Sequence, residues 1–447
     1  MLKKKIGIVS LGCPKNLVDS EVMLGILKSE NYEIVSDETL ADVIIVNTCG
    51  FIETARQESV NTILEMAKLK ERNCELLIVT GCLAERYRHE IISEIPEVDA
   101  VLGTGSYREI AAVIEKAFGG EKPELYGSLD ATEYPAGDRV ISTGKGYAYL
   151  KIAEGCDNCC TYCVIPSPRG RFRSRRMEEL LKEAGTLAAG GVRELILIAQ
   201  DTTRYGRDIY NEGKLVELIR KLSEIEGIEW IRLLYCYPEE IGAELIEEMA
   251  SNKKLCRYLD IPIQHSSERI LKSMGRRGTG SDTAILLDRI RERIPGITLR
   301  TSLIVGFPGE DEEDFSNLLA FVEKYRFDRL GVFMYSREEG TPAAAMRRQV
   351  PASTKKKRME AVMKLQQRIS GEKNRGRLGG KYRVLVEGVS EDGIFYYGRS
   401  GAEAPDIDGA IYFTSGAPLE IGEFAQVKIL NSEQYDLIGE VDNESSK

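Results

Sequence analysis

Two successive runs of alternating strand and helix signals constrain the fold of this chain more than any other feature. In the first run, apolar strand candidates lie at 6–11, 43–46, 76–80 and 101–105. Helical stretches between them lie at 16–28, 53–70 and 83–95. In the second run, strand candidates lie at 147–153, 194–199, 228–235, 258–263, 298–305 and 330–335. This rhythm predicts an α/β fold, with an N-terminal parallel-sheet domain followed by an incomplete (β/α)6 barrel.

The end of the chain has a different pattern. After two consecutive glycines at 379–380, short β-rich segments occur at 382–389, 394–399, 411–413, 424–429 and 436–441. Short strands separated by Gly and Asp turns predict a small β-barrel of the OB or TRAM type. We therefore expect an N-terminal domain at 1–120, a linker at 121–140, a barrel at 141–345, a connecting helix at 346–380 and the small barrel at 381–447.

Charge is unevenly distributed along the chain. The net charge is -10, and residues 381–447 carry five Lys or Arg against thirteen Asp or Glu. An acidic module favours a basic partner over nucleic-acid phosphates, although an acidic face kept for solubility is an alternative. The basic run 355–358 is either a solvated helix face or a contact for substrate or RNA.

No apolar stretch approaches the ~20 residues of a membrane helix. We expect a cytoplasmic protein that does not enter a membrane, in a compartment where thiols stay reduced. The ten Cys in 447 residues are too sparse for a disulfide framework.

The segment 156–163 reads Cys-Asp-Asn-Cys-Cys-Thr-Tyr-Cys and follows the first strand candidate of the second run. Read as Cys156, Cys160 and Cys163, it has the spacing C-x3-C-x2-C. Three thiolates this close suit an iron-sulfur cubane whose fourth iron stays open for a small molecule. A structural zinc site is disfavoured because it needs four ligands, and neither of the two His lies near this segment. Cys159 leaves an ambiguity, since with Cys156 and Cys163 it gives the reversed spacing C-x2-C-x3-C.

Three further cysteines each follow a strand candidate of the first run: Cys13, Cys49 and Cys82. Because ligands bind outside the carboxyl ends of strands in open α/β sheets, these three can converge on a second cluster. The alternative is that each is a small buried hydrophobe. We expect that role for the three cysteines that lack this placement, Cys74, Cys236 and Cys256.

Polar residues follow the strand candidates of the second run. They include Gln200, Asp201, Pro238, Glu239, Gln264, His265, Ser266 and the segment 306–310, which begins with Gly306 and ends with Glu310. Sites in such barrels gather at the carboxyl ends of the strands, so these residues predict a pocket for a polar, zwitterionic cofactor.

With these motifs in place, the chain resembles the methylthiotransferase family of radical S-adenosylmethionine enzymes over nearly its whole length. It is most similar to the branch that methylthiolates an aspartate of small-subunit ribosomal protein S-twelve. The motifs that carry this resemblance are Leu-Gly-Cys-Pro-Lys-Asn-Leu-Val-Asp-Ser at 11–20, the cysteine loop through Pro166, Tyr-Ser-Arg-Glu-Glu-Gly-Thr-Pro at 335–342 and Ala-Pro-Asp-Ile-Asp-Gly at 404–409. The transfer-RNA branch typically has a Gln-containing motif after its first cysteine, where this chain has Pro14-Lys15-Asn16.

The resemblance implies two 4Fe-4S clusters, one on Cys13, Cys49 and Cys82 and one on Cys156, Cys160 and Cys163. Cys159 is then a bystander, and S-adenosylmethionine is the cofactor at the second cluster. The residues expected to bind it are Tyr162, Gln200, Asp201, Gln264, Ser266, Gly306 and Glu310. A 5′-deoxyadenosyl radical would remove hydrogen from the aspartate β-carbon, and the first cluster would supply or hold the sulfur. The terminal module is then a TRAM domain.

The partners implied are ribosomal protein S-twelve or the ribosome and an electron donor, while direct contact with RNA is left open. A transfer-RNA methylthiotransferase with the same two clusters is the main alternative. A non-catalytic iron-sulfur carrier is disfavoured, because a carrier needs no pocket for S-adenosylmethionine.

Overall fold

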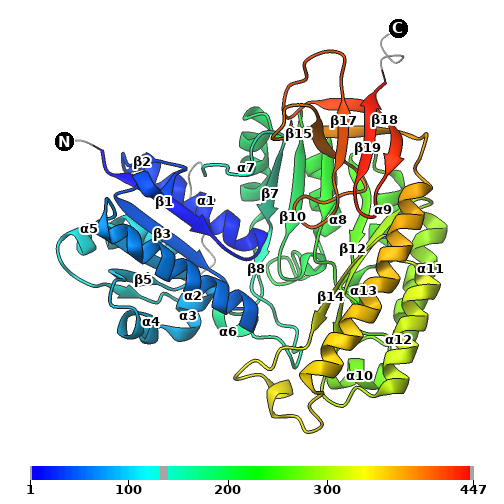
Figure 1. The fold of residues 1–447 in the computed structure, drawn as a ribbon, viewed down its shortest axis with the longest axis horizontal. Helices are drawn as coiled ribbons and strands as arrows, with labels where there is room; N and C mark the ends of the chain where they lie inside the picture. Colours follow the sequence, from blue (N-terminus) through cyan, green and yellow to red (C-terminus); the bar gives the residue numbers. More distant parts are fainter. Residues whose placement is uncertain (1–2, 131–138, 443–447) are drawn as a thin grey trace.

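The computed structural model describes residues 3–130 and 139–442, which form three parts in chain order (Figure 1). An N-terminal α/β domain is followed by a larger open barrel, and a small closed barrel ends the described chain. Residues 131–138 of the expected linker and the last five residues of the expected terminal module lie outside the described residues. Within the described part, no helix combines the length and apolar character needed to cross a membrane.

The N-terminal sheet is entirely parallel, with the strand order β2-β1-β3-β4-β5-β6. Its strands are β1 (Lys5–Ser10), β2 (Glu33–Ile34), β3 (Val43–Thr48), β4 (Leu76–Gly81), β5 (Ala100–Leu102) and β6 (Glu124–Leu125). Its helices are α1 (Pro14–Ser29), α2 (Glu53–Ala67), α3 (Cys82–Tyr87), α4 (His89–Glu94) and α5 (Ile110–Phe118). β3 and β4 are buried along their whole length, because α1 and α5 pack on one face and α2, α3 and α4 on the other. The predicted parallel α/β domain is confirmed.

Two local expectations in this domain were wrong. The stretch 83–95 forms two short helices instead of one, because Arg88 between them has φ 31° and cannot continue an α-helix. β6 comes from the segment expected as a linker and adds an edge strand beside β5.

The second part is an open barrel of six parallel strands in the order β14-β13-β12-β11-β10-β7. Its strands are β7 (Tyr147–Lys151), β10 (Glu194–Ile198), β11 (Trp230–Leu233), β12 (Leu255–Asp260), β13 (Thr298–Val305) and β14 (Arg329–Met334). Its helices are α6 (Pro166–Arg169), α7 (Met177–Ala189), α8 (Leu215–Ser223), α9 (Ala243–Ser251), α10 (Glu268–Ser273), α11 (Gly280–Arg293), α12 (Glu312–Tyr325) and α13 (Ala352–Arg375). A short antiparallel ribbon, β8 (Ala153–Glu154) with β9 (Arg173–Ser174), brackets the cysteine loop. The predicted (β/α)6 architecture is confirmed.

The chain then forms a closed five-stranded barrel in the order β15-β16-β17-β19-β18. Its strands are β15 (Lys381–Val389), β16 (Tyr396–Ser400), β17 (Ile411–Thr414), β18 (Phe424–Ser432) and β19 (Leu437–Val441). Short 3-10 turns elsewhere are η1 (Glu38–Leu40), η2 (Lys68–Glu71), η3 (Tyr107–Glu109), η4 (Thr202–Arg204), η5 (Pro238–Glu240) and η6 (Pro342–Ala345). The expected small barrel is confirmed, and closure removes the free strand edges that an open five-stranded sheet would expose.

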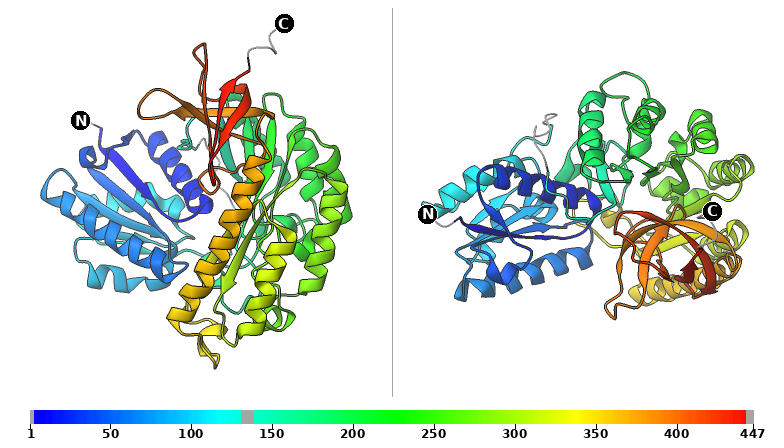
Figure 2. Two further views of the ribbon diagram at one scale, coloured as in Figure 1. Left: turned by 45° about the vertical axis from the view of Figure 1, so that its right-hand side comes forward. Right: turned by 90° about the horizontal axis from the view of Figure 1, so that it is seen from above.

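The open barrel has two differently covered faces. The side chains of one face pack against the surrounding helices, whereas those of the other face include Tyr149, Trp230 and Tyr258. Leu385 and Ala404 of the small barrel and Val18 of α1 fill this second face. The N-terminal domain and the small barrel therefore both pack against this inner face of the open barrel. Figure 2 shows the small barrel at one end of the open barrel, beside α13.

Candidate functional site

The three N-terminal cysteines lie at the carboxyl ends of three neighbouring strands. Cys13 precedes α1 after β1, Cys49 directly follows β3, and Cys82 begins α3 after β4. Gly12 has φ 87°, and a Cβ on it would lie 2.8 Å from Cys49 Sγ, so only glycine lets the first loop approach this thiol. Burial raises the pKa of Cys49 to about 11 and also raises the pKa of Cys82. The structure thus gathers these thiols in a protected place.

Buried amide groups hold these strand ends together. Asn16 Nδ2 donates to the carbonyls of Leu11 and Thr48, both at 2.9 Å, and Asn47 Nδ2 donates to the Asn16 carbonyl at 2.8 Å. Ser59 Oγ accepts from the Cys49 amide at 3.0 Å and donates to its carbonyl at 2.9 Å. These bonds fix the loops that carry the thiols.

Arg169 of α6 connects this thiol group to the barrel. Its side chain is 3% exposed, and Nε donates to Cys82 Sγ at 3.2 Å. Its Nη1 donates to Asp19 at 2.6 Å and to Glu154 at 3.1 Å. Lys151 pairs with the same two carboxylates. Two cations and two carboxylates from different domains are therefore buried together beside a cysteine.

The second cysteine group lies in the loop between β8 and β9. Backbone amides donate to two of its sulfurs, from Asn158 to Cys156 and from Ile165 to Cys163, each at 3.4 Å. Burial raises the pKa of Cys156 to about 11 and that of Cys163 to about 12, while the three sulfurs are close enough for their charges to interact. A cysteine binds iron as its thiolate, so binding of a cluster at either group would release protons.

A tyrosine and an arginine from other loops complete the surroundings of Cys160. The Tyr237 hydroxyl lies 3.2 Å from Cys160 Sγ, and the Arg276 guanidinium stacks 3.7 Å from the centre of the Tyr237 ring. Arg276 also donates to the Pro262 carbonyl at 3.0 Å. Cys159 points elsewhere, since it is exposed and its Sγ contacts the Asp157 carbonyl at 3.7 Å.

The chemistry of both groups fits iron-sulfur clusters. Among the described residues, no set of three or more His, Cys, Asp or Glu side chains is placed to hold a single metal ion. A cubane takes each thiolate on a different iron and so tolerates sulfurs that do not converge on one point. Each group also lacks the fourth ligand of a structural zinc site.

The polar residues after β10 support the cysteine loop. Asp201 accepts hydrogen bonds from Asn158 Nδ2 at 2.8 Å and from Thr203 Oγ1 at 2.7 Å, and burial raises its pKa. Gln200 Nε2 donates to Glu154, while Gln200 Oε1 is buried without a hydrogen-bond partner. Gln200 therefore keeps an acceptor free, whereas Asp201 is engaged with the loop.

Glu310 is directed back into its own loop. Its carboxylate accepts from the Gly306 and Phe307 amides at 2.8 Å and 3.2 Å and from Arg358 at 2.8 Å. Tyr162 packs edge-on against Phe307, with ring centres 6.5 Å apart. Gln264 adopts φ 67°, and its amide donates to the Ser302 carbonyl at 2.9 Å. The Glu310 carboxylate thus shapes this loop.

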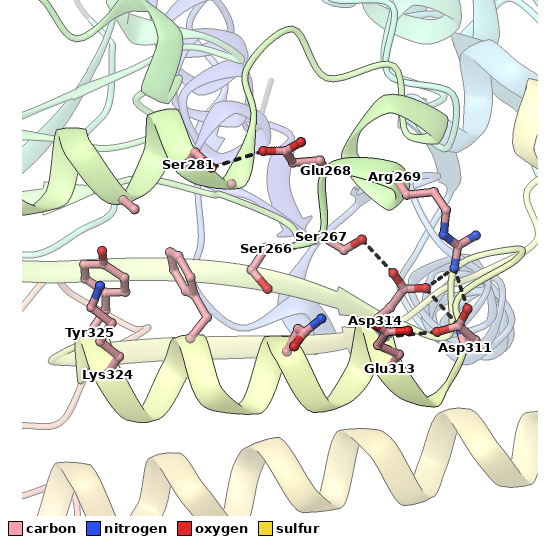
Figure 3. Close-up of a pocket in the computed structure, with 14 residues that line it drawn as sticks. Ser266, Ser267, Glu268, Arg269, Ser281, Asp311, Glu313, Asp314, Lys324 and Tyr325 are labelled. Carbon is pink, nitrogen blue, oxygen red and sulfur yellow. Dashed lines mark hydrogen bonds and ion pairs between the residues drawn. The ribbon is translucent and has the colours of Figure 1, made fainter.

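Ser266 lines a separate pocket of about 560 Å³ between α11 and α12. Figure 3 shows its side chain directed into this pocket, where Asp311 and Asp314 pair with Arg269. Ser266 Oγ is buried without a hydrogen-bond partner. The Ser266 hydroxyl therefore lines this pocket, and its contact with the cofactor stays a prediction.

The basic run at the start of α13 faces two ways. Lys355 donates to the Tyr335 carbonyl at 2.8 Å and packs on Gly306, and Arg358 pairs with Glu310. Lys356 is exposed. Lys355 and Arg358 thus brace the loop at Gly306, while Lys356 and Lys357 face solvent.

Sequence reasoning assigned no role to Lys15, Glu154, Arg169, Tyr237 and Arg276. Lys15 and Glu154 each lie two residues from a cysteine of the two groups, which was the available signal. Cys74, Cys236 and Cys256 are buried, as expected.

Three family models match successive parts of the chain. They are the uncharacterized protein family UPF0004 at residues 5–103, the radical SAM superfamily at 150–322 and the TRAM domain at 378–441. A ribosomal protein uS12 methylthiotransferase of Acetivibrio thermocellus is 62% identical, and the match covers 100% of both chains. The enzyme of the same name from Clostridium tetani is 52% identical, again over 100% of both.

This chain belongs to the ribosomal protein uS12 methylthiotransferase family.

Membership in this methylthiotransferase family confirms the resemblance that the sequence motifs indicated. Solved structures share the fold at low identity. The radical S-adenosylmethionine methyltransferase TsrM of Kitasatospora setae has a TM-score of 0.57 at 14% identity, covering 76% of this chain and 74% of that one. The cobalamin-dependent radical enzyme OxsB has a TM-score of 0.53 at 15% identity, covering 81% of this chain and 56% of that one.

Proposed function

We propose that this methylthiotransferase adds a methylthio group to the β-carbon of an aspartate in ribosomal protein uS12. The observation that carries the proposal is the full-length identity of 62% to a named uS12 methylthiotransferase. The two cysteine groups on adjoining domains support the same reaction, and Arg169 of the barrel domain contacts Cys82 of the first group.

We assign one 4Fe-4S cluster to Cys13, Cys49 and Cys82 and another to Cys156, Cys160 and Cys163. When bound, the second cluster supplies an electron and an open iron to S-adenosylmethionine, and the first supplies a place for sulfur. An electron donor must accompany the enzyme, because reductive cleavage of a sulfonium consumes an electron.

The chain's own residues shape the space between the two cysteine groups. Arg169 places a positive charge against the Cys82 sulfur, and Tyr237 contacts Cys160. Gln200 keeps a buried acceptor at the end of β10, which suits the ammonium group of the cofactor. We expect Gln200 to bind S-adenosylmethionine and Asp201, Gly306 and Glu310 to position the loops around it.

The direct test compares ribosomal proteins and transfer RNA from a strain that lacks this gene with those of the complemented strain. Mass spectrometry should locate one methylthio group on an aspartate of uS12 only when the gene is present. Complementation by a Cys160→Ala variant should fail. A methylthio group lost from transfer RNA instead, with uS12 unchanged, would move the assignment to the transfer-RNA reaction.

A further inference from the structure

Lys15 is a buried cation at the start of α1, two residues after Cys13. It is 6% exposed, and its Nζ lies 3.3 Å from the centre of the Tyr235 ring, which follows β11 of the open barrel. A side chain of the N-terminal domain thus reaches into the barrel at the end of a strand. A ring face attracts a cation, but it does not neutralise its charge.

The charge of Lys15 has no carboxylate beside it. Within residues 3–130 and 139–442, no carboxylate oxygen lies within 4.0 Å of its Nζ, whereas Lys151 in the same interface contacts both Asp19 and Glu154. Glu154 acts on Lys15 only at longer range and is already held by Lys151, Arg169 and Gln200. The Cys13 sulfur also acts on this charge, but it is not a carboxylate. A buried cation with no carboxylate in contact is costly, so this position favours an incoming carboxylate.

Lys15 also lies where the N-terminal domain meets the open barrel, near residues of both cysteine groups. On one side is Cys13, and on the other Tyr235 stands two residues before Tyr237, whose hydroxyl contacts Cys160 at 3.2 Å. Tyr235 has φ 62°, a region that bulky residues rarely adopt, and its amide donates to Asp260 at 2.9 Å. The backbone is held in this conformation with the ring beneath the ammonium group.

We propose that the Lys15 ammonium binds the side-chain carboxylate of the target aspartate. This inference rests on the proposed function. The β-carbon of aspartate is bonded directly to that carboxylate, so an ion pair at Lys15 places the reacting carbon between the two cysteine groups. A charge-assisted hydrogen bond in a buried site also selects aspartate over asparagine, and a nucleobase offers no carboxylate to it.

A binding cycle on the full-length, anaerobically reconstituted protein tests this contact without turnover. The ligand is recombinant uS12 carrying Asp or Asn at the modified position, and its dissociation constant is measured in the absence of reductant. With native enzyme, the Asp form should bind about 10- to 100-fold more tightly than the Asn form, the range for a hydrogen bond to a charged group. With Lys15→Gln, the two forms should bind equally.

Lys28→Gln is the matched control, because Lys28 is an exposed lysine on the same helix, and it should keep the native preference. Lys15→Arg retains the positive charge and should keep a preference for the Asp form. If Lys15→Gln does not fold or bind iron, Lys15→Arg tests the inference in its place. Equal binding of the Asp and Asn forms to native enzyme overturns the inference. If native enzyme nevertheless modifies uS12, the proposed function stands; if it does not modify uS12, the proposed function fails separately.

Discussion

The two ends of the chain both dock on the inner face of the open barrel, but they use charge differently. At the C-terminal interface two buried acids each contact two arginines: Glu194 pairs with Arg232 at 2.6 Å and with Arg399 at 2.8 Å. Glu403 likewise pairs with Arg329 at 2.9 Å and with Arg377. At the N-terminal interface the cations face cysteine sulfur or an aromatic ring as well as carboxylates.

This difference in charge pairing distinguishes an interface that holds two domains together from one that also carries candidate reactive groups. A buried charge that is already paired with opposite charges is less available to bind a charged ligand. At the N-terminal interface, Arg169 contacts the Cys82 sulfur, and Lys15 lies over the Tyr235 ring near Cys13 with no carboxylate oxygen within 4.0 Å among the described residues. The small barrel therefore packs on the open barrel through acid–arginine pairs, whereas the N-terminal domain brings cysteine sulfurs and Lys15 to it.

Some of the acidic side chains in residues 381–447 are buried against the open barrel and do not face solvent. Glu403 and Asp408 have side chains only 2% and 1% exposed, so they cannot attract a basic partner. Asp406 between them is exposed. Part of the charge of residues 381–447 thus belongs to the interface, and the expected recognition of ribosomal protein falls to the acids that remain on the surface.

The largest predicted effect separates the two cysteine groups. Fully reconstituted protein should hold about eight irons, and replacing Cys156, Cys160 and Cys163 with Ala should leave about four and abolish cleavage of S-adenosylmethionine. Replacing Cys13, Cys49 and Cys82 should also leave about four irons but preserve cleavage while stopping sulfur insertion. Iron analysis and measurement of 5′-deoxyadenosine check both. Four irons in the native protein would remove the basis for assigning two clusters.

The next prediction concerns Arg169, which holds the N-terminal interface. Arg169→Gln leaves two buried carboxylates with one fewer cation, and breaking a buried ion pair costs about 3–5 kcal/mol. Arg171→Gln is the control, since the Arg171 side chain is 84% exposed and its ion pair with Asp157 is long, at 3.8 Å. Urea unfolding of cluster-free protein should show a loss for Arg169→Gln and a change below ~1 kcal/mol for Arg171→Gln. Equal losses would mean that the network contributes no stability.

Patterns that are local in the chain were predictable, and contacts between distant segments were not. The spacing of Cys156, Cys160 and Cys163 and the five terminal strands lie within short stretches of sequence. The group of Cys13, Cys49 and Cys82 was predictable because neighbouring parallel strands end at the same edge of a sheet.

Other features had no signal of this kind. Arg169 contacts Cys82 across 87 residues, and Arg358 contacts Glu310 across 48. No periodicity links such positions, so the packing of one domain on another must be known first. The helix break at Arg88 could not be predicted, because no Gly or Pro lies within residues 83–95. Asp408 reads as a surface acid in a turn, and only the docking of the small barrel buries it.

A smaller effect is expected from pH at the C-terminal interface. Burial alone would raise the pKa of Glu403, but Arg377 and Arg329 outweigh it and lower the pKa to about 2. The folded-state pKa lies below the unfolded value of ~4.3, so the stabilisation is complete above that value and is lost as the pH falls toward 2. Unfolding of cluster-free protein between pH 6 and pH 3 should show native protein losing on the order of 2 kcal/mol more than Glu403→Gln. Parallel losses would show that this carboxylate is not held ionised.

Asp408 and Asp406 form a matched pair of substitutions that tests the same interface through smaller expected changes in the free energy of unfolding. Asp408 Oδ2 accepts from the Tyr258 hydroxyl at 2.7 Å and from the Ala404 amide at 2.8 Å. Asp408→Asn should cost about 1–3 kcal/mol, because a donor replaces an acceptor in a buried site. Asp406 is exposed and accepts a long hydrogen bond from the Tyr149 hydroxyl at 3.4 Å, which an Asn oxygen can also accept. Asp406→Asn should therefore change stability by less than ~0.5 kcal/mol. If Asp406→Asn were the more damaging change, the exposed acid would be the one that matters for docking.

The smallest effect is predicted for Cys159, an exposed residue of the cysteine loop that takes part in neither domain interface. Its side chain is exposed and contacts only the Asp157 carbonyl, whereas its neighbour Cys160 contacts Tyr237. Cys159→Ser should keep the full iron content and the native rate of S-adenosylmethionine cleavage, because a serine hydroxyl can also donate to the Asp157 carbonyl that the thiol contacts at 3.7 Å. Cys160→Ser should lose the second cluster, since a neighbouring thiol directed to solvent cannot replace the missing ligand. If Cys159→Ser lost the cluster and Cys160→Ser kept it, the ligands would have the reversed spacing, and the contact of Tyr237 with Cys160 would have no part in cluster binding.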